Sequence, residues 1–229
     1  MDRHLVRGFP PTQNDALAAL RGGDARALET LASIYWRPVY SYLRLRWRRP
    51  HEEAADLAQE FFADVVEKEI LTRFDPARAR LRTFLRACVD GLVSNHDRAA
   101  ARRKRTFDFE SIREEIFESN VAGSPEELFE KEWARAVFAT ALSRLRDECA
   151  KSGKSAHYAL LERYHLAGER KTYAELASES GIPVTDVTNR LSRTRRELRR
   201  IVLDVLREST GSEEELREEA RALFRGDGA

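Results

Sequence analysis

The stretch Lys171–Leu206, KTYAELASESGIPVTDVTNRLSRTRRELRRIVLDVL, decides how the rest of the chain is interpreted. Thr172, followed three residues later by Glu175, predicts a capping box, in which side chains satisfy the free amides of a helix N-terminus. Gly181 suits a turn that ends this short helix, because glycine tolerates a positive φ. Pro183 is expected in the first turn of a second helix. The stretch therefore predicts two helices joined by a tight turn.

The second of these helices has two unlike faces. At about 100° per residue, one face is mostly apolar and carries Val187, Leu191, Thr194, Leu198 and Val202. The opposite face carries amide, hydroxyl and guanidinium groups: Thr185, Asn189, Ser192, Arg193 and Arg196. Such groups donate hydrogen bonds to phosphates and base edges, so the stretch predicts a DNA-binding helix-turn-helix. A solvated, arginine-rich face of a bundle helix is the alternative interpretation.

Bulk composition limits the possible classes of protein. The 229 residues are enough for one large domain or two small ones. Hydrophobic residues make up 42% and charged residues 34%, which is typical of small helical domains with much surface. Cys88 and Cys149 lie far apart, which excludes a disulfide framework and zinc-ligand spacing and indicates a cytoplasmic protein. No apolar run approaches the ~18 residues of a membrane helix, so we expect no membrane insertion.

Apolar spacing predicts helices through the front half of the chain. Asp24 is expected to cap a helix that Pro38 interrupts and kinks. The next helix is predicted from about Glu53 to Leu71, and its apolar arc is wider than one neighbouring helix requires. Phe62 and Val66 lie at the edge of that arc. They either pack under the preceding helix or contact a partner protein.

A basic segment and an acidic segment follow one another. The helix predicted over Ala77–Arg105 ends in a cluster without acids, which indicates a polyanionic partner or a helix end favoured by the dipole. From Thr106 to Glu132 there are nine acids and two bases, and this reversal is the best domain boundary. Ser124 with Glu127 predicts a capping box that opens the next helix. Ser212 is expected to cap a last helix, acidic at its start, that can fold back onto a basic surface.

The predicted fold is all-α, with two small helical domains joined by an acidic linker, the second containing the helix-turn-helix. We expect a disordered N-terminus over 1–13 and a first domain over 14–105. The linker is placed at 106–123, the second domain at 124–206 and a helical tail at 207–229.

In this order the two helical modules resemble the sigma-70 family, specifically its compact extracytoplasmic-function (ECF) type. The resemblance spans about residues 15–206 and is carried by DLAQEFFADVVEK (Asp56–Lys68), FDPARARLRTFLRACVDGLVSNHDRAAARRKR (Phe74–Arg105) and TYAELASESGIPVTDVTNRLSRTRRELR (Thr172–Arg199). It implies a sigma factor that directs bacterial RNA polymerase to promoters, with no enzymatic activity, cofactor or metal. The implied partners are the β and β′ subunits of core polymerase, promoter DNA and, as an open question, an anti-sigma factor.

The resemblance also implies roles for particular residues. Region 2 of the family corresponds to the first domain, and region 4 to the second. The residues implied in polymerase core binding are Asp56, Leu57, Gln59, Glu60, Phe62 and Ala63. Those implied in contacting and melting the −10 element are Arg80, Arg82, Arg86, Asn95, Arg98 and Arg102. Those implied at the −35 element are Thr185, Thr188, Asn189, Ser192, Arg193 and Arg196.

The chain departs from the family pattern at three places. Gly91 stands where relatives often have asparagine, so melting would rely more on Asn95, His96 or the neighbouring arginines. Thr188 stands where a lysine is common, which leaves the −35 preference open. The segment Glu208–Ala229 exceeds the minimal family plan and is hypothesised to be a regulatory or solubilising appendage.

Three other functions compete with this interpretation. The first is a stand-alone helix-turn-helix regulator that binds an operator without polymerase. The second is a helical interaction protein that uses the Asp56–Lys68 surface for another partner. The third is a nucleic-acid enzyme, which is least expected because the five histidines are scattered and no Ser/His/Asp grouping or phosphate-binding glycine loop occurs.

Overall fold

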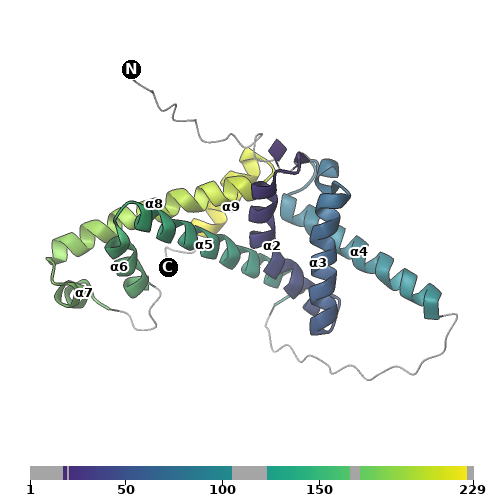
Figure 1. Ribbon diagram of the computed structural model, residues 1–229, viewed down its shortest axis with the longest axis horizontal. Helices are drawn as coiled ribbons and strands as arrows, with labels where there is room; N and C mark the ends of the chain where they lie inside the picture. The colour runs from purple at the N-terminus through teal and green to yellow at the C-terminus, as the bar shows by residue number, and fades with distance from the viewer. Residues whose placement is uncertain (1–17, 20, 105–122, 166–170, 226–229) are drawn as a thin grey trace, which may run out of the picture. The chain divides into compact units, whose positions relative to one another are not determined.

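The computed structural model describes residues 18, 19, 21–104, 123–165 and 171–225 (Figure 1). Within these ranges every regular element is helical and there is no strand, so the all-α class is confirmed. The N-terminal segment 1–13 lies outside the described residues. The predicted linker 106–123 lies outside them too, apart from Gly123.

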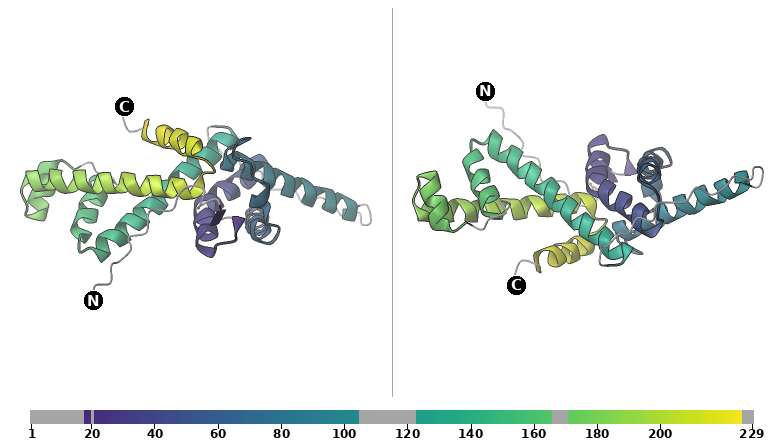
Figure 2. Two further views of the ribbon diagram at one scale, coloured as in Figure 1. Left: turned by 90° about the horizontal axis from the view of Figure 1, so that it is seen from above. Right: turned by 90° about the horizontal axis from the view of Figure 1, so that it is seen from below.

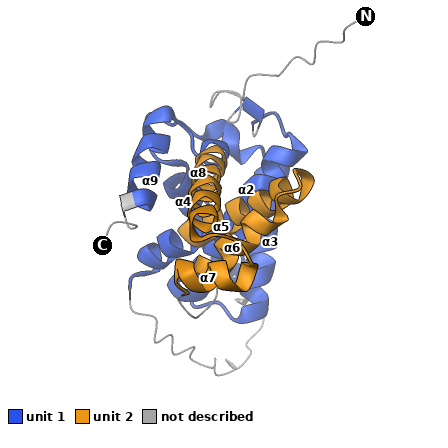
Figure 3. Ribbon diagram, turned by 90° about the vertical axis from the view of Figure 1, so that its left-hand side faces the viewer, with its two compact units in different colours: residues 1–133, 207–229 blue, residues 134–206 orange. Residues whose placement is uncertain are grey.

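The chain divides into two compact units (Figure 3). Unit 1 draws on residues 1–133 and 207–229, and unit 2 on residues 134–206. Helix α5 (Pro125–Lys151) and helix α8 (Val184–Ser209) therefore contribute residues to both. Unit 1 thus includes the C-terminal segment, which the sequence predicted as a separate tail. It also includes the start of α5, which the sequence predicted as part of the second domain.

Unit 1 is built mainly from four long helices and a short 3-10 helix. Helices α2 and α3 lie side by side, and the C-terminal part of α4 extends away from them (Figure 2). The elements are α2 (Ala25–Arg46), α3 (His51–Glu67), η1 (Ile70–Arg73), α4 (Leu81–Lys104) and α9 (Glu213–Arg225).

Local chemistry explains where these helices begin and end. Asp24 caps α2 as predicted, accepting a hydrogen bond from the Ala27 amide at 2.9 Å. Pro38 is buried inside α2, and the helix continues past it to Arg46. The prediction of one helix to Leu71 is wrong, because Glu69 has a left-handed φ of 47° that an α-helix cannot accommodate.

The core of unit 1 joins α2, α3, α4, the start of α5 and α9. Its largest fully buried side chains include Tyr35, Phe61, Leu85 and Phe129. The C-terminal segment belongs to this core, because the Tyr35 hydroxyl donates to the Ser209 carbonyl at 3.1 Å. A Cβ atom added at Gly211 would lie 2.2 Å from the Phe74 ring, so only glycine fits this approach.

Unit 2 comprises residues 134–151 of α5, α6 (Ser155–His165), α7 (Tyr173–Ser180) and residues 184–206 of α8. Four apolar residues of α5 at intervals of four share one face of the helix and are buried: Val137, Ala141, Leu145 and Cys149. Across the described part of the chain, no helix combines the length and the apolar character needed to cross a bilayer.

Candidate functional site

Helix α7 begins in the capping box that the sequence predicts. The Thr172 hydroxyl accepts from the Glu175 amide at 3.2 Å, and the Glu175 carboxylate accepts from the Thr172 amide at 2.7 Å. The Thr172 hydroxyl also donates to the Glu175 carboxylate at 2.9 Å. Because the amide and the hydroxyl of Thr172 both donate to the charged carboxylate, they lower the pKa of Glu175 below its ordinary value. The prediction is confirmed, and the start of α7 is fixed locally.

The turn between α7 and α8 depends on one left-handed residue. Gly181 has a φ of 63°, and the Ile182 amide reaches back to the Ala177 carbonyl at 3.2 Å, which ends α7. The Pro183 carbonyl then accepts the first hydrogen bonds of α8, from Asp186 at 2.9 Å and Val187 at 3.2 Å. Pro183 therefore immediately precedes α8, where its missing amide costs no helical hydrogen bond.

Helix α8 has the two faces expected from its spacing. Val187, Leu191, Thr194 and Val202 are buried, and Leu198 is half-buried. All six residues implied at the −35 element are exposed: Thr185, Thr188, Asn189, Ser192, Arg193 and Arg196. The structure thus places these six side chains on the solvent side of one helix.

The arginines of α8 differ in whether an acid neutralises them. Arg200 pairs with Glu148 and Glu197 at 2.7 Å each and with Asp204 at 2.8 Å. Arg193 and Arg196 form no ion pair with any described residue. Arg193 also lines an open groove of about 490 Å³ together with Lys154 and His157. Glu148 and Glu197 line the same groove, so Arg193 is exposed beside acids but forms no ion pair with a described residue.

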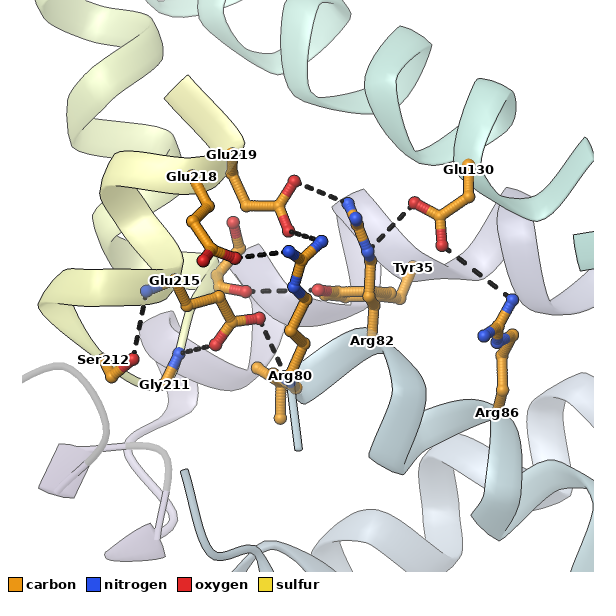
Figure 4. Close-up of polar contacts among 12 residues, drawn as sticks. Tyr35, Arg80, Arg82, Arg86, Glu130, Gly211, Ser212, Glu215, Glu218 and Glu219 are labelled. Atoms are coloured by element: carbon orange, nitrogen blue, oxygen red, sulfur yellow. Dashed lines mark hydrogen bonds and ion pairs between the residues drawn. The ribbon is translucent and has the colours of Figure 1, made fainter. Parts of the chain in front are cut away.

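The arginines at the start of α4, unlike Arg193 and Arg196, are paired with acidic side chains (Figure 4). Arg80 pairs with Glu218 and with Glu219, the latter at 3.3 Å, and both acids belong to α9. Arg86 lies 3.8 Å from Glu130 of α5. Acidic side chains of the same unit thus occupy these guanidinium groups.

Arg82 is the most enclosed of the three arginines. Its guanidinium pairs with Glu219 at 2.7 Å and Glu130 at 2.9 Å, and it lies 4.6 Å from the centre of the Trp133 ring. The side chain of Glu219 is only 1% exposed. Burial raises the pKa of Glu219, while the positive charges of Arg82 and Arg80 act in the opposite direction.

Glu215 of α9 accepts a hydrogen bond from the first residue of α4. Its carboxylate accepts from the Leu81 amide at 2.9 Å and from the Gly211 amide at 2.8 Å. It therefore caps α4 from a position 134 residues away, and satisfies an amide that the helix itself leaves free. Burial raises the pKa of this carboxyl group above its ordinary value.

The other end of α4 is open. Arg98 and Arg102 are exposed, and their Nε atoms donate only to carbonyls of their own helix, at 3.1 and 3.3 Å. Exposed Asn95 lines a groove of about 640 Å³ with His96 and Gly91. A Cβ atom at Gly91 would meet nothing within 4 Å, so the departure from asparagine leaves space at this point.

The residues implied in polymerase binding lie on α3. Asp56, Gln59, Glu60 and Ala63 are exposed, whereas Leu57 is only 2% exposed and belongs to the core. Beside them is an apolar patch, here called the α2–α3 patch: Trp36, Phe62 and Val66.

In the α2–α3 patch, the rings of Trp36 and Phe62 stack with centroids 5.6 Å apart. Trp36 is 40% exposed and Val66 52%. Phe62 therefore packs partly against α2, and the patch as a whole still faces solvent. Of the two alternatives left open by the sequence, packing under the preceding helix holds for Phe62, which stacks on Trp36 of α2, whereas Val66 is exposed. Contact of Val66 with a partner protein stays a prediction.

Sequence reasoning missed the acids that contact the α4 arginines. Glu130 was counted only among the acids of the segment from Thr106 to Glu132. The last helix was expected to be able to fold back onto a basic surface, but its acids Glu215, Glu218 and Glu219 and their partners were not predicted. The available signal was their spacing, since residues three and four apart share one face of a helix. Trp36, which belongs to the α2–α3 patch, was not predicted either.

The chain matches no family model, no curated protein and no solved structure. Among the described residues there is also no group of three or more His, Cys, Asp or Glu side chains arranged to hold a metal ion.

Proposed function

We propose that this chain is an ECF-type sigma factor, which directs bacterial RNA polymerase to promoters. The observation that carries the proposal is the exposed row on α8, where Arg193 and Arg196 stand with hydroxyl and amide groups and without an acid partner among the described residues. In this proposal α7, the Gly181 turn and α8 form a helix-turn-helix, and α8 enters the major groove of the −35 element.

At the −35 element, the exposed row supplies two kinds of contact. Arg193 or Arg196 can bind a guanine through two hydrogen bonds, which discriminates against the wrong base by about 1–3 kcal/mol. Thr185 and Ser192 can donate to phosphates, which positions the helix without reading sequence. The Thr188 hydroxyl donates to the Val184 carbonyl of its own helix at 3.0 Å. The absence of a lysine at Thr188 shifts the electrostatic share of binding to the two arginines.

At the −10 element, the open end of α4 is the favoured contact. Arg98 and Arg102 can contact phosphates of a separated strand, and Asn95 can hydrogen-bond a base. Unstacking a base costs a few kcal/mol, and phosphate contacts offset part of that free energy. Arg82 is better suited to holding unit 1 together, because its guanidinium is enclosed by protein.

Core polymerase is proposed to bind the α3 surface. The α2–α3 patch supplies exposed apolar area, and Asp56, Gln59 and Glu60 supply a polar rim. Apolar centres with polar rims are the usual arrangement of protein interfaces. The acidic linker is proposed to enter the RNA channel of polymerase.

Reconstitution with bacterial core polymerase tests the proposal. The full chain should direct initiation from a set of starts that share an upstream element, when starts are mapped across genomic DNA. Arg193→Ala or Arg196→Ala should weaken use of that element by about 1–3 kcal/mol if the side chain reads a guanine. Arg221→Ala on α9, also exposed, is the control and should change nothing.

A different result would point to another class of protein. If the chain ignored core polymerase and bound a defined operator duplex tightly by itself, it would be a stand-alone helix-turn-helix regulator. If neither polymerase nor duplex were bound, both proposals would be wrong.

A further inference from the structure

Helix α9 is held on unit 1 by contacts that solvent does not reach. Glu219 pairs with Arg82, and Glu215 accepts from the Leu81 amide. The preceding turn packs Gly211 against the Phe74 ring so closely that no Cβ would fit. Removing one partner of a buried ion pair leaves an uncompensated charge, so these contacts keep α9 in place.

The pair between Arg80 and Glu218 is of a different kind. Its two side chains are 43% and 44% exposed, whereas those of Arg82 and Glu219 are 11% and 1% exposed. Water and salt reach the exposed pair, and such surface pairs contribute little net free energy. Arg80 also donates to the buried Glu219 at 3.3 Å, so the contact with Glu218 is the part of its pairing that solvent reaches. That contact can be exchanged for another anion while α9 stays docked.

A phosphate and a carboxylate are equivalent acceptors for a guanidinium group, since both take two parallel N–H bonds. We infer that the Glu218 carboxylate of α9 competes with the phosphates of nucleic acid for Arg80, so that a phosphate must displace Glu218 to reach this guanidinium. This inference rests on the function proposed above. The open arginines Arg98 and Arg102 contact the strand without this competition. Glu218 therefore lowers affinity for nucleic acid at the N-terminal end of α4 and not at its C-terminal end.

The test measures binding of the full chain to a fluorescein-labelled oligonucleotide of 20 thymidines by anisotropy, over a range of salt concentrations. Glu218→Gln should raise affinity by about three- to tenfold at low salt, because one phosphate contact is added. The slope of log K against log salt should become steeper by about 0.7. The unfolding midpoint should stay unchanged, because the buried contacts of α9 remain.

Two further variants show whether the gain passes through Arg80. Glu214→Gln removes the same charge from an exposed position on α9 that forms no ion pair with the described residues, and its affinity should stay within about twofold of wild type. In the double variant Arg80→Ala with Glu218→Gln, affinity should return to that of Arg80→Ala alone.

Equal gains for Glu218→Gln and Glu214→Gln would overturn the inference, because the effect would then be general electrostatics. A gain that persisted without Arg80 would overturn it as well. In either case, affinity that still fell in Arg98→Ala and Arg102→Ala would leave the proposed function standing. If no variant bound the oligonucleotide even with core polymerase present, the proposed function would fail together with the inference.

Discussion

Arg80 and Arg82 are two residues apart at the start of α4, and their surroundings differ sharply. Arg80 is reached by solvent, while Arg82 is closed in by Glu130, Glu219 and the Trp133 ring. Charge alone makes both of them plausible contacts for phosphate. Burial separates them, because a guanidinium already desolvated beside two carboxylates gains little from a third anion.

Arg82→Ala should destabilise unit 1 by about 3–5 kcal/mol, because it leaves Glu219 buried without its closest partner. Urea unfolding followed by tryptophan fluorescence measures this, since all three tryptophans lie in unit 1. Arg78→Ala is the matched control. Its exposed pair with Asp75 should contribute no more than about 0.5 kcal/mol. An equally small effect of Arg82→Ala would show that α9 is not docked on this arginine.

Gly91→Ala should stabilise unit 1 by about 0.5–1 kcal/mol, because an exposed glycine inside a helix has lower helix propensity than alanine. The added Cβ meets nothing within 4 Å. Gly23→Ala should destabilise unit 1 in the same fluorescence assay. Gly23 has a φ of 72°, in the left-handed region that residues with a Cβ disfavour. Destabilisation by Gly91→Ala would mean that α4 is not continuous at this residue.

The start of α7 and the turn into α8 are defined by a few residues that are close in sequence. Thr172 and Glu175 satisfy each other's amides, and Gly181 reverses the chain through one left-handed residue. All of these interactions lie within a few residues in sequence. They therefore set the start of α7 and the turn into α8 independently of the rest of unit 2.

Thr172→Ala should raise the pKa of Glu175 toward its ordinary value, because it removes the hydroxyl contact and loosens the bond from the residue 172 amide. Carboxyl titration by NMR measures this shift. Because the wild-type pKa is lowered, the carboxylate contributes stability above the ordinary value of 4.5 that is lost as pH falls through the lowered pKa. Thr188→Ala should leave the Glu175 pKa unchanged, since that hydroxyl donates to the Val184 carbonyl. An unshifted pKa in Thr172→Ala would contradict the capping box.

Considered as a whole, the chain carries a net charge of only +1, and its charges are segregated. In unit 1, acids of α5 and α9 neutralise the start of α4, while its far end stays basic. In unit 2, Arg200 is neutralised and Arg193 is not. A small net charge is therefore compatible with two exposed basic surfaces, one in each unit.

Val66→Glu should lower affinity of the full chain for core polymerase by about tenfold, because it places a charge in the apolar α2–α3 patch. Binding is measured without DNA. Val184→Glu is the matched control, as Val184 is similarly exposed but lies in unit 2. Val66→Glu should unfold at the same urea concentration as the wild-type protein. Equal polymerase affinity for both variants would show that the patch is not the docking surface.

Much of this protein follows from interactions between near neighbours in sequence. The caps at Asp24, Thr172 and Ser124, the Gly181 turn and the two faces of α8 all depend on residues three or four apart, so periodicity and spacing were enough to predict them. The exposed row at the −35 candidate site was predicted in the same way.

The placement of α9 required the tertiary structure. Arg82 and Glu219 are 137 residues apart, and Leu81 and Glu215 are 134 apart. Periodicity shows that α9 has an acidic face, but any exposed basic surface would satisfy that face equally well. Which arginines it covers depends on how the helices pack, since burial decides which ion pairs solvent can reach. Packing therefore made Arg82 part of the core and left Arg98 and Arg102 open.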